Sequence, residues 1–199
     1  NTFKEMGVDY VVSGGQSMNP STEDFIIGFD TLNAENIIVF PNNKNIVLAA
    51  KQAAKIYKES KIWVVETKTI SQGFSALTML DLSGEPEDIM EEMKEVINNV
   101  ISGSITYSIR DTEFEDVSIK KGDYIGICNG KIVTSNVSRL ESVKKLLEFS
   151  DIAEKEIVTI ITGKDAPAEE IAAIKAFINE TYSHVEIDEI TGEQDIYSY

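Results

Sequence analysis

The side chains best suited to ligand chemistry gather in a glycine-containing loop at residues 13–19. Its polar side chains are those of Ser13, Gln16, Ser17 and Asn19, beside the glycines Gly14 and Gly15. Hydroxyl and amide groups hold an anion or a peptide backbone by hydrogen bonds, and glycines let the loop approach a ligand closely. The loop contains no residue that could act as a base, a nucleophile or a soft metal ligand. The pattern therefore indicates a binding edge.

The same loop leads into a helix whose start is marked by several residues. Asn19 is the expected N-cap, and Pro20 takes the first helical position, where its missing N–H costs nothing. Glu23 and Asp24 place negative charge against the positive end of the helix dipole. A purely structural interpretation also stays open, in which residues 14–19 only shape a tight turn and cap this helix.

Other kinds of active site find little support in the sequence. His184 is the only histidine and lies far along the chain from Cys128, the only cysteine, so neither a metal site nor a Ser-His-Asp triad is expected. Gly14-Gly15 is not followed by Gly-Lys-Ser or Gly-Lys-Thr and is not a three-glycine dinucleotide fingerprint. ATP binding by this fragment is therefore not expected. Residues 111–116 hold several carboxylates, but no pattern there indicates a mechanism.

Three short apolar runs predict the strands that position the loop. They are residues 10–12, 36–40 and 61–65, and a helical pattern follows each of them. Such alternation predicts a parallel sheet with helices on its faces, and ligands of these sheets bind where the strands end. The loops expected at that edge contribute further candidate binding residues: Asn42, Asn43, Thr67, Ser71 and Gln72.

The second half of the chain has a different pattern. A helix is expected to start at Pro86, and alternation then predicts a strand at residues 105–109. Asn129-Gly130 between two β-prone runs predicts a tight hairpin, and Ser138 with Glu141 has the spacing of a capping box. We therefore expect an α/β protein with an N-terminal lobe at residues 1–82 and a C-terminal lobe with a mixed sheet at residues 83–199.

Composition narrows the function further. The net charge of −16 disfavours nucleic acid and anionic membranes as partners, because both would be repelled. The excess of acidic residues between Asp81 and Asp116 favours a solvated surface, with an acidic docking surface as the alternative. With a single cysteine, expected to be buried, and no apolar span, the chain is expected to be a cytoplasmic piece of a longer protein without stable membrane insertion.

Three motifs closely resemble the C-terminal region of the kinase subunit of bacterial fatty acid kinase, in the dihydroxyacetone-kinase-like or DAK phosphatase family. The motifs are Gly14-Gly15-Gln16-Ser17-Met18-Asn19-Pro20-Ser21-Thr22-Glu23-Asp24, Pro41-Asn42-Asn43-Lys44-Asn45-Ile46 and Gln72-Gly73-Phe74-Ser75-Ala76-Leu77. The resemblance covers essentially the whole chain. One departure is Gly192-Glu193-Gln194, where members of the family often have a second Gly-Gly-Gln.

The resemblance implies a two-lobed DegV-like fold and a role within a kinase, with ATP and Mg²⁺ bound by a domain outside this fragment. It implies no catalytic residue, metal or cofactor here. The implied task is to dock the fatty-acid-binding subunit, beside the other domains of the parent protein, so that the acyl carboxylate is phosphorylated elsewhere. The alternative is that the chain itself binds a fatty acid or another small carboxylate between its lobes.

Overall fold

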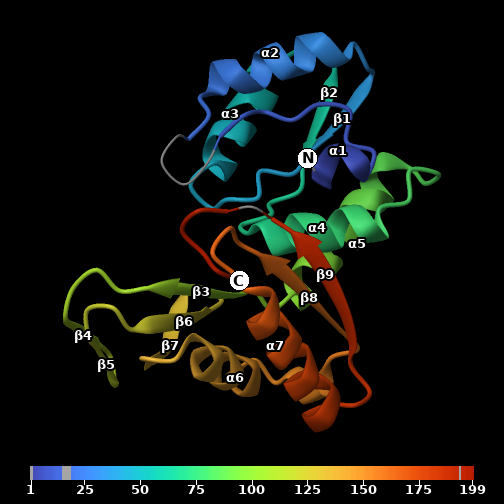
Figure 1. Ribbon diagram of the computed structural model, residues 1–199. Helices are drawn as coiled ribbons and strands as arrows, with labels where there is room; N and C mark the ends of the chain where they lie inside the picture. Colours follow the sequence, from blue (N-terminus) through green and yellow to red (C-terminus); the bar gives the residue numbers. More distant parts are fainter. Residues whose placement is uncertain (1, 15–18, 193) are drawn as a thin grey trace. The chain divides into compact units, whose positions relative to one another are not determined.

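A computed structural model describes residues 2–14, 19–192 and 194–199 (Figure 1). Its internal contacts divide the chain into two units, one of residues 1–100 and one of residues 101–199. The division falls after helix α5 (Pro86–Asn99), whereas the sequence placed it at residues 82–83, before this helix. The physical reason is that Ile89, Met93 and Ile97 of α5 share a core with Val65 and Ala76, so the helix belongs with the first unit.

The first unit is built on a parallel pair of strands flanked by helices. Its elements are α1 (Thr2–Glu5), α2 (Thr22–Leu32), β1 (Asn36–Val39), α3 (Val47–Ile56), β2 (Lys61–Val64), α4 (Ile70–Met79) and α5. Strands β1 and β2 pair in register from Asn36 opposite Lys61 to Val39 opposite Val64. The predicted alternation of strand and helix is therefore confirmed for these two strands.

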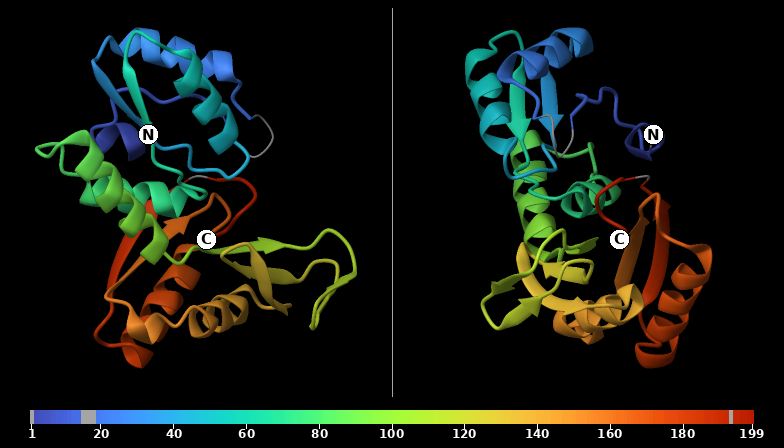
Figure 2. Two further views of the ribbon diagram at one scale, coloured as in Figure 1. Left: turned by 180° about the vertical axis from the view of Figure 1, so that it is seen from behind. Right: turned by 60° about the vertical axis from the view of Figure 1, so that its left-hand side comes forward.

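Each face of the β1–β2 pair is covered by its own pair of helices. Ile37 and Val39 pack with Phe25 and Phe29 of α2 and the small alanines of α3. Ile38, one residue along, packs instead with the core that α4 and α5 share. Figure 2 shows α2 beside α3 in this unit. The alternation of side chains along β1 thus divides the unit into three layers.

Two predictions about the start of this unit are wrong. Residues 10–12 form no strand; this segment has no ladder hydrogen bonds, and Val12 packs against the α2–α3 core as irregular chain. Helix α2 is capped by Ser21 rather than Asn19, so Pro20 precedes the cap. The reason is a capping box: the Asp24 carboxylate accepts from Ser21 N at 2.7 Å, while Ser21 Oγ accepts from Asp24 N at 3.3 Å.

The second unit contains antiparallel and parallel strand pairs. Its elements are β3 (Gly103–Tyr107), β4 (Thr112–Phe114), β5 (Val117–Ile119), β6 (Tyr124–Cys128), β7 (Lys131–Asn136), α6 (Arg139–Phe149), the 3₁₀ helix η1 (Ile152–Glu154), β8 (Ile157–Thr162), α7 (Ala168–Thr181) and β9 (Glu186–Thr191). Strands β3, β6 and β7 form an antiparallel sheet, β4 pairs with β5, and β8 lies parallel to β9.

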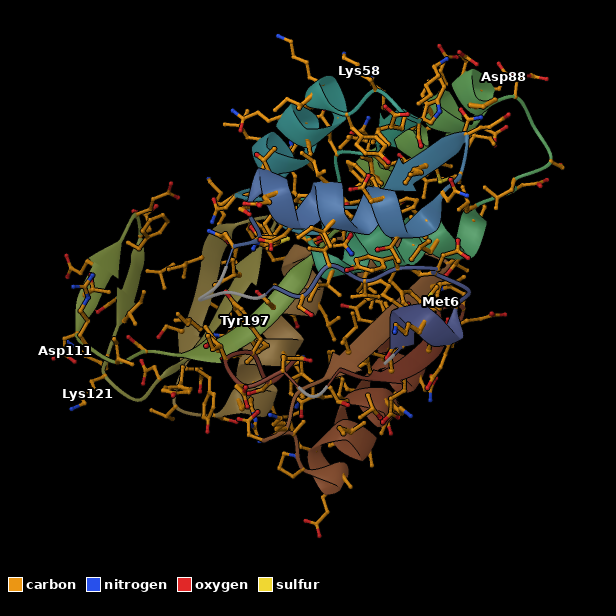
Figure 3. All side chains as sticks on the ribbon, turned by 90° about the horizontal axis from the view of Figure 1, so that it is seen from above. Met6, Lys58, Asp88, Asp111, Lys121 and Tyr197 are labelled. Atoms are coloured by element: carbon orange, nitrogen blue, oxygen red, sulfur yellow. The ribbon has the colours of Figure 1, made fainter. Side chains whose placement is uncertain are left out.

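Local signals in this unit are mostly confirmed. Asn129 and Gly130 both have positive φ and join β6 to β7, as the Asn-Gly pair predicts. Ser138 caps α6 by accepting from Glu141 N at 3.3 Å. The β4–β5 hairpin is closed at its open end by Lys121 N, which donates to Asp111 Oδ1 at 2.7 Å, and both residues are labelled in Figure 3.

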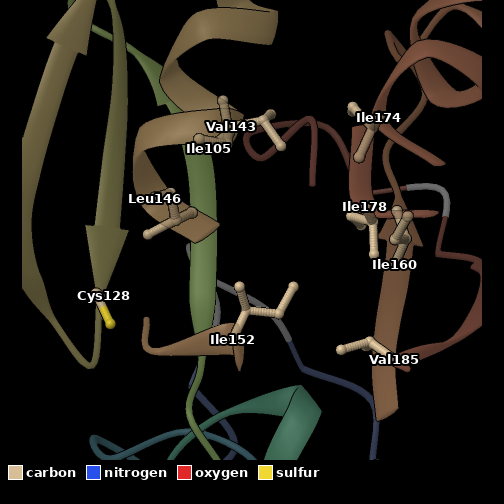
Figure 4. Close-up of a cluster of buried hydrophobic side chains, with 9 residues drawn as sticks. All are labelled: Ile105, Cys128, Val143, Leu146, Ile152, Ile160, Ile174, Ile178 and Val185. Carbon is tan, nitrogen blue, oxygen red and sulfur yellow. The ribbon is translucent and has the colours of Figure 1, made fainter. Parts of the chain in front are cut away.

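One apolar core joins the strand groups of the second unit. Figure 4 shows Ile105, Leu146, Ile160 and Ile178, from β3, α6, β8 and α7, in this cluster. Cys128 is buried in it, as predicted. The backbone is joined as well: Ile105 N donates to Tyr199 O at 3.0 Å, and Gly163 N donates to Ser198 O at 2.8 Å. Residues 198–199 thus link β3 to the end of β8.

The capping box of α2 predicts a pH-dependent contribution to stability. Hydrogen bonds from the Ser21 backbone and hydroxyl lower the pKa of Asp24 below its ordinary 3.8. A carboxyl with a depressed folded pKa stabilises the fold above its unfolded pKa, and this is lost as the pH falls through the folded value. Asp24→Asn should therefore lower the melting temperature of the first unit at pH 7, and the difference from wild type should disappear once the pH falls below the lowered pKa of Asp24 in the folded state.

Fluorescence of Trp63, the only tryptophan, reports melting of the first unit. Glu23→Gln is the matched control, because it removes the same charge from the same helical turn outside the capping box. Equal effects of the two substitutions at every pH would contradict the assigned role of Asp24.

Candidate functional site

The loops after β1 and β2 meet in the first unit, as the parallel pairing requires. Thr67 is fully buried, and its hydroxyl accepts from Asn42 N and donates to Asn42 Oδ1, both at 2.9 Å. Asn42 has a left-handed backbone, with φ of 57°. These two predicted site residues are therefore brought together, and each satisfies polar groups of the other.

Gln72 is also used inside the unit. Its Oε1 accepts from Lys68 N at 2.7 Å, and its Nε2 donates to Ile97 O at 2.9 Å, near the end of α5. Ser71 Oγ lies 3.0 Å from the hydroxyl of Thr69, which caps α4 by accepting from Gln72 N. Gln72 thus fixes the start of α4 and joins it to α5.

Asn43 shapes the turn that leads into α3. Its Oδ1 accepts from Asn45 N at 2.9 Å, and its carbonyl accepts from Ile46 N at 2.9 Å. Ser13, Gly14 and Asn19 are exposed, whereas Gly15, Gln16 and Ser17 lie outside the described residues. Of the predicted binding residues that the structure describes, those after β1 and β2 hold loops together, while those of the glycine loop face solvent.

Sequence reasoning missed a buried polar network in the second unit. The Arg139 side chain is only 9% exposed; its Nε donates to Glu170 Oε1 at 2.6 Å and its Nη1 to Asp165 Oδ2 at 2.7 Å. Nη1 also lies 3.1 Å from Ser198 Oγ. The available signal was local: Arg139 directly follows the N-cap of α6, where a cation opposes the helix dipole.

The electrostatics show that this network is neutralised internally. Burial lowers the pKa of the Arg139 guanidinium, but the hydrogen bond and charge of Glu170 outweigh it and raise the pKa overall. Burial, followed by donation to Glu170 at 2.8 Å, raises the pKa of the Tyr199 phenol. Because two carboxylates already pair with the guanidinium, the network does not offer a free cation to a ligand.

Gln194, which belongs to the segment where the chain departs from a second Gly-Gly-Gln, also has a structural role. Gln194 Nε2 donates to Ile161 O at 2.9 Å, and Gln194 O accepts from Lys164 N at 3.1 Å. His184 Nε2 lies 3.0 Å from Ala153 O. Across residues 2–14, 19–192 and 194–199, no three His, Cys, Asp or Glu side chains are grouped as metal ligands. No helix in these ranges has the length and hydropathy to cross a membrane.

The family model for the FakA-like C-terminal region of fatty acid kinase matches residues 1–199. The chain belongs to this family. Protein YloV of Bacillus subtilis is 41% identical over 197 residues, which cover 99% of this chain and 35% of YloV. The chain therefore spans about a third of the length of this relative. The family assignment confirms the resemblance seen in the three motifs.

Solved structures confirm the DegV-like fold. The DegV family protein Cg2579 of Corynebacterium glutamicum has a TM-score of 0.65 and 12% identity, over 95% of this chain and 84% of that protein. The Fak B3 protein of Streptococcus pneumoniae, solved with linoleic acid, has a TM-score of 0.61 and 12% identity, over 86% of this chain and 69% of that protein. At such identities the likeness concerns the fold alone.

Close contact between Gly73 and Asn42 generates one prediction. A Cβ on Gly73 would lie 1.9 Å from Asn42 Oδ1, so Gly73→Ala must displace an amide that Thr67 holds. Helix propensity favours alanine by about 1 kcal/mol, but overpacking costs about 1–3 kcal/mol. We expect the variant to lose up to about 2 kcal/mol of its free energy of unfolding, measured in urea by Trp63 fluorescence.

Two further variants test the cause of this loss. In an Asn42→Gly background the clash is gone, so Gly73→Ala should become stabilising by up to about 1 kcal/mol. At Gly84 a Cβ would meet nothing closer than 3.6 Å, and Gly84→Ala should be neutral or stabilising. A loss at Gly73 that persisted without the Asn42 side chain would contradict the packing explanation.

The Arg139 network generates a second prediction. Arg139→Met removes the cation that pairs with Glu170 and Asp165, and breaking a buried pair in this way costs about 3 kcal/mol. Lys131→Met is the control, because Lys131 is 65% exposed and its ion pair with Glu115 should contribute about 0.5 kcal/mol or less. Hydrogen exchange of peptides from residues 101–199 measures both. Similar losses for the two variants would contradict a structural role for the network.

Proposed function

We propose that this chain is a docking domain for a fatty-acid-binding protein of the Fak B type, acting in the cytoplasm. It holds that protein so that the acyl carboxylate reaches an ATP-binding kinase domain located elsewhere in the parent protein. Membership of the FakA-like C-terminal family supports this role. Under this proposal the chain itself carries no catalytic residue and needs no cofactor; ATP and Mg²⁺ belong to the kinase domain.

The proposal rests on one observation: polar side chains in the loops after β1 and β2 already have hydrogen-bond partners within the chain. Asn42, Thr67 and Gln72 use their side chains to hold the loops of the first unit, and Arg139 is paired with two carboxylates. A site for a small carboxylate needs donors that point at the ligand and lack internal partners. A strand edge whose described donors are used in this way is better suited to support a docking surface than to hold a small molecule.

Docking alone contributes to catalysis. A bound partner carries its acyl group at an effective concentration set by the tether, which reaches the millimolar range for short linkers. Holding the two reacting groups together also removes part of the entropic barrier of a bimolecular step. The chain would therefore accelerate phosphoryl transfer without touching the reacting atoms.

Calorimetry with the fatty-acid-loaded Fak B-type protein of the same organism tests the proposal. We expect a one-to-one complex with a Kd of about 10 μM or tighter. Heat changes indistinguishable from dilution at about 100 μM of both proteins would contradict it.

The alternative is that the chain itself binds a fatty acid, and the DegV-like fold supports it, because a protein of this fold was solved with linoleic acid. Native mass spectrometry separates the two functions. A fatty acid retained by the purified chain, together with no binding of the partner, would favour the alternative. The docking function predicts the reverse result.

A further inference from the structure

A hollow on the surface of the first unit has an apolar floor and an acidic rim. It has a volume of about 270 Å³ and lies between the end of α4 and the second half of α5. Met79, Met93 and Val96 supply the apolar lining, whereas Glu92, Glu95 and Asn99 supply the polar one. Met79 exposes 63% of its surface, and Leu82, just after α4, exposes 70%. Apolar surface of this kind is therefore available to a partner.

Helix α5 carries more acidic side chains than those in its first turn, where the helix dipole favours them. The helix carries five acidic residues and a single lysine, and its last turn contains no basic residue. The N-terminal Glu87 pairs with Lys61 at 2.8 Å. Glu92 and Glu95 instead lie in the middle of the helix and before its last turn. Among the described residues neither glutamate has an ion-pair partner within the chain.

The side chains of Glu92 and Glu95 are both exposed. Figure 3 shows α5 seen from above, with the side chain of Asp88 extending from its N-terminal part into solvent. Gln72 already donates to one carbonyl at the other end of the helix, that of Ile97. The negative charge of the hollow comes from Glu92 and Glu95, the two carboxylates in its lining.

The lining selects one kind of occupant. An arginine or lysine would lay its aliphatic stem on Met79 and Val96, above the buried Met93, and place its charge between Glu92 and Glu95. A fatty acid carboxylate would be repelled by the same rim. A second copy of the chain is disfavoured because each copy carries a net charge of −16.

We infer that this α4–α5 hollow is the docking site for a basic, apolar segment of the protein partner. The inference rests on the proposed function, because it takes that partner to be the fatty-acid-binding protein, and it adds where and by which chemistry the partner is held. The partner contributes a cationic side chain flanked by apolar residues. Binding neutralises the carboxylates of Glu92 and Glu95 on α5.

Charge removal in the full chain tests the inference. Glu92→Gln/Glu95→Gln should weaken binding of the partner about tenfold and reduce the dependence of Kd on salt. Glu148→Gln/Glu180→Gln is the matched control: it removes two exposed glutamates from the last turns of α6 and α7 and should change Kd less than about twofold.

A second variant tests the apolar floor without changing the charge. Met79→Ala should weaken binding about fivefold or more, since it removes exposed apolar surface that the partner would cover. If wild type binds the partner and neither variant alters Kd beyond the control, this inference is overturned while the docking function stands. If wild type itself fails to bind, the docking function is overturned and the inference falls with it.

Discussion

The small number of strands in each sheet is the constraint that shapes the rest of this structure. Within the part of the first unit that the structure describes, β1 and β2 pair only with each other, and an isolated pair is marginally stable in water. Each face must therefore be buried by helices, which explains why Ile37 and Ile38 enter different cores. It also explains why the loops between these elements need their own hydrogen bonds: with so few strands, the loops supply much of the order that a wider sheet would give.

This constraint explains why the polar side chains at the strand ends form hydrogen bonds within the chain. Asn42, Thr67 and Gln72 occur where ligand-binding residues of an open α/β sheet are expected. In this chain they join β1, β2, α4 and α5 to one another. The same residue types at the same edge thus serve packing, and the surface left for recognition consists of helix faces and exposed loops. In the second unit Arg139 has a comparable use, since it joins α6 to α7 and to the segment after β9.

Much of this fold was predicted from local sequence signals, whereas contacts between residues far apart in the sequence could not be predicted. Asn129-Gly130 and Ser138 with Glu141 act within a few residues, so their roles could be read directly. Asn19 was the wrong cap because Ser21 and Asp24 compete for the same helix start by a reciprocal pair of hydrogen bonds. Residues 10–12 have the apolar character of a strand but find no ladder partner.

The site was harder to predict than the fold for the same reason. The spacing of the loops predicted that Asn42 and Thr67 would approach one another, but not that they would satisfy each other. The partners of Arg139 lie 26 and 31 residues further along the chain, and periodicity carries no information about such pairs. What the sequence identified well was the family, because its motifs combine many positions.

The linkage made by residues 196–199 has a consequence for the order of folding during synthesis. Thr106 Oγ1 donates to Ile196 O across a separation of 90 residues, and Ile105 exchanges backbone hydrogen bonds with residues 198 and 199. The first unit is complete by Val100 and can fold as soon as it leaves the ribosome. The second unit must wait for residues 196–199, so until then β3 keeps an unpaired edge that other chains could bind.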